Sequence, residues 1–461
     1  MHLFWHQRDL RLRDNRGLHA AASDGPVVPV FVYDTDFLEH VGPRQRAFFL
    51  RGVRSLQRSY REGGSDLLVR TGAASEVLPE VADELDADTV VYNEHYRPAR
   101  RARQQRVETA CDRAGLDTIT ETDLVLVDPG RLDDRYPNHS QFHNDWQAVP
   151  KSAPYPAPEG SELLTFDSSE TVPVPDCDID LPDAGYRAAR ERYDAFLDEG
   201  IYSYNDTRDD LPAAVERPTR AVSRMSPYVA AGMIGLRELW RDATAVHDAV
   251  DGHERRNVRK YRYELSWREQ NYHLLYYNPD LPTENYKSLP NAIEWRDAPE
   301  DFETWKRGET GYPLVDAGMR QLREEGYVHN RPRQVVASFL TKHLLVDWRK
   351  GRRHFAAQLV DHDPASNAGN WQWIASTGTD SVDVRIFDPV SQLSKYDDGA
   401  RFVKAYVPEL ADVPADKVVD WPTLSAEERD RLAPAYPDPV VDRNEGYERA
   451  QRVFEQALGK R

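Results

Sequence analysis

Short apolar runs separated by helix-length amphipathic segments fill the first 130 residues, and this alternation constrains the fold more than any other feature of the sequence. The runs are LFW near Leu3, VVPVFVY from Val27, DLLVR from Asp66, TVVYN from Thr89 and DLVLV from Asp123. Segments 45–62 and 97–114 have the length of helices. Strands that alternate with helices form a doubly wound parallel sheet. We therefore predict an α/β domain over residues 1–130, although no GxGxxG motif follows its strands.

The sequence changes character after this domain. Residues 131–185 are rich in Pro, Ser, Asp and Asn and have no sustained periodicity, which predicts an inter-domain connector wrapped over the surface. From Tyr186 onward the pattern is helical nearly throughout, as in SPYVAAGMIGLRELWRDAT and YPLVDAGMRQLREEG, with Ser or Pro at the expected starts. We predict an all-helical domain over residues 186–461.

The formal net charge of −18 would ordinarily argue against a nucleic-acid partner. Residues 331–360 nevertheless carry seven basic side chains and one acidic, so a locally basic face is expected. The acidic surface, with far more Arg than Lys, fits a chain adapted to high salt.

The remaining composition excludes several classes of protein. With Cys111 and Cys177 as the sole cysteines, neither a disulfide framework nor a metal site is expected. No apolar run reaches transmembrane length, and the first ten residues are charged. We expect a cytoplasmic protein without a membrane partner.

Polar and aromatic residues are concentrated between Asp361 and Pro389, in DHDPASNAGNWQWIASTGTDSVDVRIFDP. Buried indoles beside carboxylates and an amide cost desolvation energy unless a fixed polar group lies against them. A planar, hydrogen-bonding cofactor would meet that need, and a polar-rimmed loop is the alternative. Upstream, Ser223 and Ser226 precede an apolar helix, where they fit either an anion cradle or a plain N-cap.

Several motifs recur in order over most of the chain: GYPLVDAGMRQL, HNRPR, ASFL, DW, GNWQWIASTGTD and RIFDP. They closely resemble the photolyase/cryptochrome family, and specifically its class I cyclobutane-pyrimidine-dimer photolyases. The resemblance runs from Leu3 to about Trp421. It implies a helical domain that binds reduced FAD, light-driven repair of pyrimidine dimers in DNA, and a monomer. With the acidic composition, it indicates a member from a halophilic archaeon.

The resemblance also implies which residues hold FAD. The family's diphosphate loop matches the SRMSP segment, and other matching residues contact the flavin and ribityl groups. The side chain that matches Asn367 lies against flavin N5, where an amide can share a hydrogen bond as the ring changes redox state. The implied FAD contacts are Tyr204, Val222, Ser223, Arg224, Met225, Ser226, Tyr261, Arg268, Arg333, Asp361, His362, Asp363 and Asn367.

Trp371, Trp348 and Trp295 match, at the same intervals, the family's electron-transfer chain between flavin and surface. Indoles are oxidisable, so a row of them provides stepping points, although tryptophan is also ordinary core filling.

A substrate pocket is expected beside the flavin. Glu264, Trp267 and Arg268 share one helical face, and with Trp373 and Asn330 they offer two indoles, a carboxyl and an amide to a flipped pyrimidine pair. Glu264 matches the residue that stabilises the dimer radical anion in the family.

Basic and amide side chains outside the pocket are expected to position the DNA. Arg208, Arg331 and Gln392 rest on motif position, whereas Lys342, Arg349, Lys350, Arg352 and Arg353 rest on charge alone.

The chain departs from the family at a few positions. Gln334 replaces a Met of the pocket, Asn271 a Tyr, and Tyr261 a Trp next to the flavin. Ala99 and Arg100 stand where folate-binding relatives carry an Asn-Glu pair, so a deazaflavin antenna is expected in preference to folate. A chain without an antenna is the other alternative.

Three other functions compete with dimer repair. A (6-4) photoproduct enzyme uses a pair of histidines in the pocket, but Asn330 follows His329 here. A cryptochrome-type light sensor often carries a long tail, whereas this chain ends about forty residues after its last family motif. A nicotinamide or flavin oxidoreductase would need the glycine fingerprint that the first domain lacks.

Overall fold

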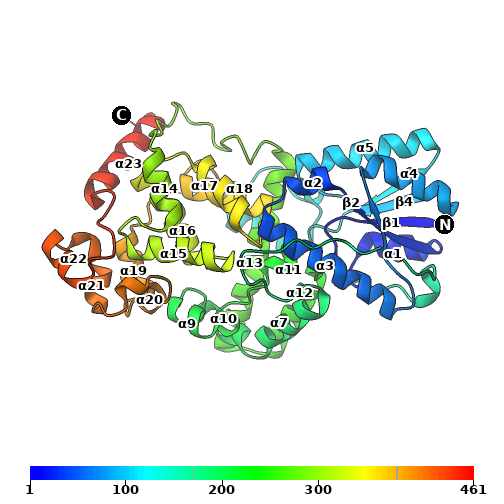
Figure 1. Cartoon of the computed structure of the whole chain (residues 1–461), viewed down its shortest axis with the longest axis horizontal. Helices are drawn as coiled ribbons and strands as arrows, with labels where there is room; N and C mark the ends of the chain where they lie inside the picture. The colour runs from blue at the N-terminus through cyan, green and yellow to red at the C-terminus, as the bar shows by residue number, and fades with distance from the viewer. Residues whose placement is uncertain (169, 380–382, 461) are drawn as a thin grey trace.

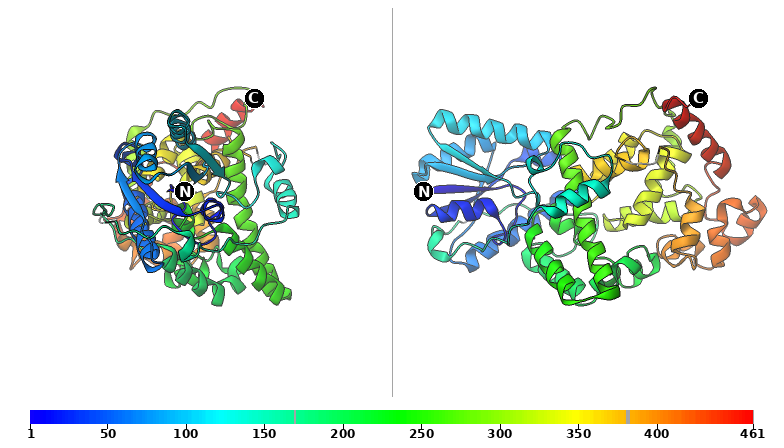
Figure 2. Two further views of the ribbon diagram at one scale, coloured as in Figure 1. Left: turned by 90° about the vertical axis from the view of Figure 1, so that its right-hand side faces the viewer. Right: turned by 180° about the vertical axis from the view of Figure 1, so that it is seen from behind.

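The protein has two lobes, an α/β lobe at the N-terminus and a larger helical lobe that contains the C-terminus (Figure 1). The computed structural model describes residues 1–168, 170–379 and 383–460. The two termini lie at opposite ends of the molecule, as the rear view in Figure 2 also shows.

The N-terminal lobe is built on a five-stranded parallel sheet with the order β3-β2-β1-β4-β5. Its strands are β1 (His2–His6), β2 (Val27–Tyr33), β3 (Leu68–Thr71), β4 (Thr89–Asn93) and β5 (Asp117–Glu121). The helices are α1 (Arg16–Ser23), α2 (Thr35–Glu39), α3 (Pro43–Glu62), α4 (Ala74–Leu85) and α5 (Pro98–Ala114). The predicted fold class, a doubly wound α/β domain followed by a helical one, is confirmed.

Both faces of the sheet are covered, which is why its central strands β2, β1 and β4 are buried over nearly their whole length and apolar in their middle positions. In β1, Leu3 and Trp5 belong to one buried cluster with residues of α4 and α5. Phe4 points the other way and packs into a cluster with residues of α1 and α3. Successive side chains of a strand alternate between its faces, so each helical layer receives every second residue.

One predicted strand is wrong. The apolar run DLVLV from Asp123 is not a strand, and the fifth strand is the polar segment DTITE just before it. This strand lies at the edge of the sheet and is largely exposed, so it needs no apolar side chains. The 123–127 segment instead crosses to the helical lobe, where the backbone N–H groups of Leu126 and Val127 donate to Glu269 at 2.8 and 3.2 Å.

The connector contains more structure than its composition predicts. Residues 139–148 form helix α6 (His139–Ala148), and Leu163 makes a parallel bridge to Val27 of the sheet. The connector therefore contacts both lobes. The proposed boundaries at 130 and 185 remain predictions.

The rest of the chain is helical. Its helices are α7 (Tyr186–Asp198), α8 (Tyr204–Thr207), α9 (Leu211–Glu216), α10 (Pro218–Ala221), α11 (Ser226–Ala230), α12 (Leu236–Ala249), α13 (Gly252–Tyr277), α14 (Pro299–Arg307), α15 (Pro313–Glu325), α16 (Asn330–Ser338), α17 (Trp348–Gln358), α18 (Pro364–Ala375), α19 (Pro389–Tyr396), α20 (Arg401–Tyr406), α21 (Ala415–Val419), α22 (Ala426–Leu432) and α23 (Arg443–Ala457). The run from Ser226, predicted as one helix, is two helices with a break at Gly232.

Gly232 explains this break. It has a φ of +67°, and a Cβ there would lie 1.8 Å from the carbonyl oxygen of Arg8 in the N-terminal lobe. A side chain is therefore excluded by the close approach of the two lobes. The contact brings the loop after β1 against the helical lobe.

A buried ion pair crosses the same interface. The Arg8 guanidinium lies 2.7 Å from the carboxylate of Asp363, and both side chains are 9% exposed. The Tyr272 hydroxyl also donates to Asp363, and Arg8 donates to Tyr272. Burial opposes ionisation of this carboxyl, but Arg8, Arg268 and these hydrogen bonds outweigh it and lower the pKa of Asp363 well below its usual range.

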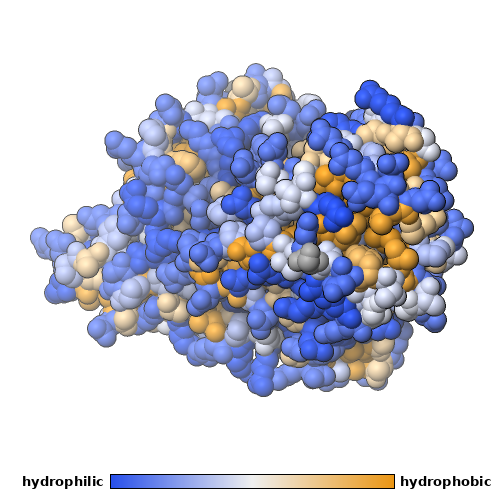
Figure 3. All heavy atoms as spheres, turned by 45° about the vertical axis from the view of Figure 1, so that its right-hand side comes forward, coloured by the Kyte–Doolittle hydropathy of each residue, from blue (hydrophilic) through white to orange (hydrophobic). Residues whose placement is uncertain are grey.

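The outer surface is largely hydrophilic. Figure 3 shows polar residues over most of one face, with hydrophobic residues gathered on its right side. Within the described ranges, the helices are all too short or too polar to cross a lipid bilayer.

We expect Arg8→Met to lower the free energy of unfolding by about 3–5 kcal/mol, because it leaves the Asp363 carboxylate buried without its cationic partner. Thermal or urea denaturation at pH 7 measures this change. Since folding lowers the pKa of Asp363, the stabilisation should be complete above about pH 4 and decline as the pH falls further.

The matched control is Arg401→Met. Its partner Glu216 lies 2.6 Å away, but both side chains are at least half exposed. A loss of no more than about 1 kcal/mol is expected. Equal losses in the two variants would contradict the importance of the buried pair.

Candidate active site

Two adjoining cavities open between α11, α13, α16 and α18. The larger has a volume of about 690 Å³ and the smaller about 230 Å³. They share the wall residues Ser226, Tyr327, Asn330, Gln334, Ser366, Asn370 and Trp373. Molecules bound in the two cavities would therefore be close neighbours.

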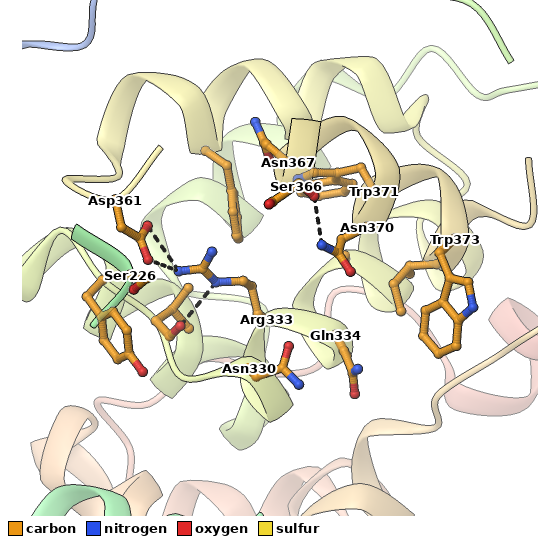
Figure 4. Close-up of a pocket in the computed structure, with 15 residues that line it drawn as sticks. Ser226, Asn330, Arg333, Gln334, Asp361, Ser366, Asn367, Asn370, Trp371 and Trp373 are labelled. Atoms are coloured by element: carbon orange, nitrogen blue, oxygen red, sulfur yellow. Dashed lines mark hydrogen bonds and ion pairs between the residues drawn. The ribbon is translucent and has the colours of Figure 1, made fainter. Parts of the chain in front are cut away.

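The smaller cavity has an ion pair at one end and indoles at the other (Figure 4). Arg333 lies 3.1 Å from the Asp361 carboxylate and donates to the Val328 carbonyl oxygen, also at 3.1 Å. The Asp361 side chain is 3% exposed, so its orientation is fixed. A planar group with donors and acceptors along one edge could bond to both members of this pair.

Helix α18 supplies the opposite wall. It begins with Asp363 as N-cap, whose carboxylate accepts from the Ser366 N–H at 2.8 Å, and Pro364 occupies the first helical turn. Asn367, Trp371 and Ile374 follow one another at helical spacing and line the cavity. The Asn367 amide nitrogen donates to the Arg352 carbonyl oxygen at 3.1 Å, which leaves its own carbonyl oxygen for a donor in the cavity.

Helix α13 forms one side of the larger cavity with a single face. The residues that line it are Lys260, Tyr263, Glu264, Trp267, Arg268 and Asn271, at intervals of three, one, three, one and three. This is the spacing of one helical stripe. A Cβ on Gly369 of α18 would lie 2.0 Å from the Asn271 side chain, so glycine allows α13 and α18 to approach.

Positive charge dominates the larger cavity, despite the acidic composition of the chain. Among its described lining residues, Glu264 is the only acidic one, and the basic ones are Arg208, Arg224, Lys260, Arg268, Arg331 and Arg385. Glu264 accepts from Arg208 at 2.8 Å and from Lys260 at 2.6 Å. This field would attract a polyanion.

The residues that line the two cavities fit FAD. The Nε of Arg224 is buried and has no hydrogen-bond partner among the described residues, which suits an anionic ligand. Arg224 follows Ser223 in the loop before α11, with a φ of +50°, and both residues line the larger cavity. The diphosphate would therefore meet an arginine and hydroxyls, and the flavin would meet Arg333, Asp361 and Asn367.

Comparison with known proteins agrees with this geometry. Residues 261–456 match the model of the FAD binding domain of DNA photolyase, and residues 2–159 match that of DNA photolyase. The chain is 44% identical to a deoxyribodipyrimidine photo-lyase of Halobacterium salinarum, with 100% of both chains covered. The chain belongs to the DNA photolyase family. The predicted family and enzyme class are thus confirmed.

Solved photolyase structures are similar over the whole chain. A bacterial class III photolyase from Agrobacterium tumefaciens has a TM-score of 0.88 and 32% identity, covering 100% of this chain and 98% of the other. An archaeal photolyase from Sulfolobus tokodaii, solved with two FAD molecules, has a TM-score of 0.85 and 31% identity, with 99% of both chains covered.

Most of the FAD contacts inferred from the photolyase motifs lie around the two cavities. They are Tyr204, Val222, Ser223, Arg224, Met225, Ser226, Arg268, Arg333, Asp361 and Asn367. Among described residues, three others lie outside the cavity walls. Tyr261 lies behind Tyr204 at a ring distance of 5.4 Å, His362 lines a cavity against the N-terminal lobe, and Asp363 bonds to Arg8.

The residues inferred to bind substrate converge on the larger cavity, which Arg208, Glu264, Trp267, Asn330, Arg331, Gln334 and Trp373 all line. Arg331 pairs with Asp209 at 2.9 Å. Gln392 is a half-buried residue of α19, outside these walls.

The charge-based prediction for Lys342 is wrong. Its side chain is fully buried and donates to the Ala375 carbonyl oxygen and the Ser376 hydroxyl, so it does not reach DNA. Arg349, Lys350, Arg352 and Arg353 belong to α17, and they lie outside the walls of the larger cavity. Charge along the sequence does not show which side chains face a cavity.

The tryptophans of the inferred electron-transfer series lie at the smaller cavity, in the interior and at a partly exposed position. Trp371 is buried at the smaller cavity, Trp348 is fully buried, and Trp295 is half-buried against Phe454. A Cβ on Gly351 of α17 would lie 2.2 Å from the Trp371 ring, so this glycine lets the two helices meet.

Several residues that line the two cavities were not predicted from the sequence. Arg385 lines the larger cavity, with its guanidinium 4.6 Å from the Trp373 ring, and Tyr327 and Asn370 line both cavities. Lys260 could have been found from its spacing of four before Glu264. Arg385 begins the RIFDP motif, but nothing in the sequence shows which way it points.

We expect Gly351→Ala to displace the Trp371 indole and to cost about 1–3 kcal/mol of folding stability, because the new methyl group overlaps the ring. Thermal unfolding measures the stability. Light-driven reduction of bound oxidised flavin should slow in the same variant. Ala357→Ser, at an exposed position of α17, should leave the melting temperature and the reduction rate unchanged, and a normal rate in Gly351→Ala would contradict this packing.

Proposed function

We propose that this enzyme repairs cyclobutane pyrimidine dimers in DNA by light-driven electron transfer from reduced FAD. The observation that carries the proposal is the common wall of the two cavities. A flavin held by Arg333, Asp361 and Asn367 would lie in the smaller cavity. A flipped pyrimidine dimer held by Trp267 and Trp373 would lie next to it in the larger cavity. When bound, reduced FAD supplies an electron after absorbing near-UV or blue light.

The substrate end of the cavity suits flat bases with polar edges. The Trp267 and Trp373 rings are 6.4 Å apart and inclined at 72°, so two adjoining aromatic walls face the opening. Aromatic walls of this kind stack on bases that have been flipped out of a duplex. Glu264 and Asn330 provide a carboxyl and an amide for the base edges, and Gln334 adds a second amide.

The cationic side chains have two roles in this proposal. Arg333 and Arg268 favour the anionic form of a reduced flavin by placing positive charge at its edge. Arg208 and Arg331 lie at the larger cavity, where they would contact the DNA backbone. Gln392 is proposed as a further DNA contact, and the enzyme is proposed to act as a monomer.

Trp371, Trp348 and Trp295 are proposed to return the flavin to its reduced form after accidental oxidation. Trp371 lines the cavity, Trp348 is fully buried and Trp295 is partly exposed, so the series ends at a residue that solvent can reach, which supports this role. Trp305 also contacts Trp371, at a ring distance of 6.3 Å.

The alternatives are less well supported. Repair of (6-4) photoproducts calls for a histidine acid, but burial lowers the pKa of His329 to about 4, and so this residue is neutral at physiological pH. The neighbouring Asn330 cannot donate a proton as an acid. A cryptochrome-type sensor without repair activity would not need the stacking walls and basic rim of the larger cavity.

A second chromophore is proposed for the cavity between the lobes. This cavity is lined by Phe48, Phe49, Arg97, Arg100 and His362, among others. Burial and the nearby charges of Arg8 and Arg97 hold the pKa of Arg100 well below its ordinary value. An anion bound in this cavity would reduce the repulsion between these cations. The cavity has a volume of about 40 Å³, so it would have to widen to admit an anionic flavin-type chromophore, of which deazaflavin is preferred to folate. The absorbance of the purified protein distinguishes these chromophores.

The decisive experiment incubates the reduced protein with dimer-containing DNA in light and in darkness. Dimers should disappear in light alone. If they persist in both, the repair proposal fails and the sensor alternative gains. A parallel incubation with (6-4) photoproducts should show no repair.

Glu264→Ala should lower the repair yield per photon roughly tenfold, since a hydrogen bond to a charged group is worth about 1.5–3 kcal/mol. The FAD content should stay unchanged. Glu254→Ala, in the exposed first turn of the same helix, should repair dimers normally. Loss of FAD in Glu264→Ala would contradict the assigned role.

A further inference from the structure

An imidazole from the connector lies flat against one of the proposed base-stacking tryptophans. His139 is the first residue of α6, and its ring stacks on Trp267 of α13 with 3.7 Å between centroids and 9° between planes. Trp267 lines the larger cavity, whereas His139 is buried behind it. One face of the indole is therefore covered by the protein, and the free part of the ring faces the cavity.

His139 is itself held in place on several sides. Its Nδ1 lies 2.8 Å from the Gln270 amide oxygen, and its Nε2 lies 3.1 Å from the Ser266 hydroxyl. The Tyr263 ring meets it edge-on at 4.8 Å and 90°. These partners come from one face of α13, which also carries Trp267. The imidazole thus has fixed in-plane hydrogen bonds while its face remains available to the indole.

The stack stays neutral. Burial lowers the pKa of His139 to about 3. A neutral imidazole has one donor nitrogen, which suits the Gln270 amide oxygen at Nδ1, while the Ser266 hydroxyl near Nε2 also donates to the Tyr263 carbonyl oxygen at 2.7 Å. The ring therefore packs as a flat, uncharged surface at physiological pH.

We propose that His139 is a positioning residue for substrate binding, which holds the Trp267 indole in the plane that a flipped base requires. A closely stacked pair restricts the orientation of both rings, which flexible aliphatic packing does not. Helix α6 is thereby part of the substrate site, although it lies in the connector. This inference rests on the proposed repair function.

A purely structural role would give a different pattern of effects. If His139 only fills the core, its loss should lower stability and FAD content together with DNA binding. If it positions Trp267, its loss should weaken dimer binding, while FAD content and the repair rate at saturating DNA stay unchanged. A planar replacement should restore the stack without its hydrogen bonds.

The experiment uses the FAD-loaded enzyme and three variants: His139→Ala, His139→Phe and His143→Ala. His143 lies one turn further along α6, bonds to Ser266 and contacts Tyr263, Trp146 and, at 6.0 Å between ring centroids, His139, but the ring that stacks on Trp267 is that of His139. Dark titration with a dimer-containing oligonucleotide gives Kd, and light-driven repair gives KM and kcat. FAD absorbance and melting temperature report folding.

We expect His139→Ala to raise Kd and KM about threefold to tenfold with kcat unchanged. His139→Phe and His143→Ala should stay within about twofold of the unmodified enzyme. Unchanged Kd in His139→Ala, or equal weakening in the Ala and Phe variants of His139, would overturn the positioning role. Loss of FAD in both His139→Ala and His139→Phe would also overturn the positioning role.

These outcomes are separate from failure of the proposed function. An unmodified enzyme that binds dimer-containing and undamaged DNA equally would refute dimer repair, and with it the substrate role of the stack. An enzyme that selects dimers while His139→Ala does so equally well would refute the inference about His139 alone.

Discussion

The buried ion pair between Arg8 and Asp363 is the interaction on which the arrangement of the site depends. Asp363 caps the first turn of α18 while its other carboxylate oxygen bonds to Arg8 and Tyr272. The position of α18 is therefore tied to the loop after the first strand of the N-terminal lobe. Because α18 carries Asn367 and Trp371, the flavin contact and the first indole depend on a contact between lobes.

Close helix approach brings the reacting groups together. Glycines at 351 and 369 remove the side chains that would keep α17 and α13 away from α18. Because these positions have no side chain, Trp371 can lie against α17. For the same reason, the cavity-lining face of α13 lies close to α18, which carries Asn367, Trp371 and Ile374. Local charge follows from this packing, since arginines from separate segments converge on one cavity in an acidic protein.

The connector shows where prediction from the sequence reaches its limit. Its Pro-rich composition indicated a surface wrap, and nothing in His139 distinguished it from an ordinary polar residue. Its stack on Trp267 joins segments more than a hundred positions apart in the chain. In contrast, the α13 stripe at Glu264, Trp267 and Arg268 was predictable because helical spacing alone places these residues on one face.

The sequence by itself determined the class of fold, the family motifs and most residues that line the two cavities. Apolar periodicity fixes which elements form, and motif spacing fixes which side chains share an element. Only the tertiary structure decided that Lys342 is buried, that Asp363 turns toward Arg8, and that the polar segment at 117–121 forms the edge strand. Burial, ion pairing and edge position depend on neighbours from distant parts of the chain, and no local pattern contains them.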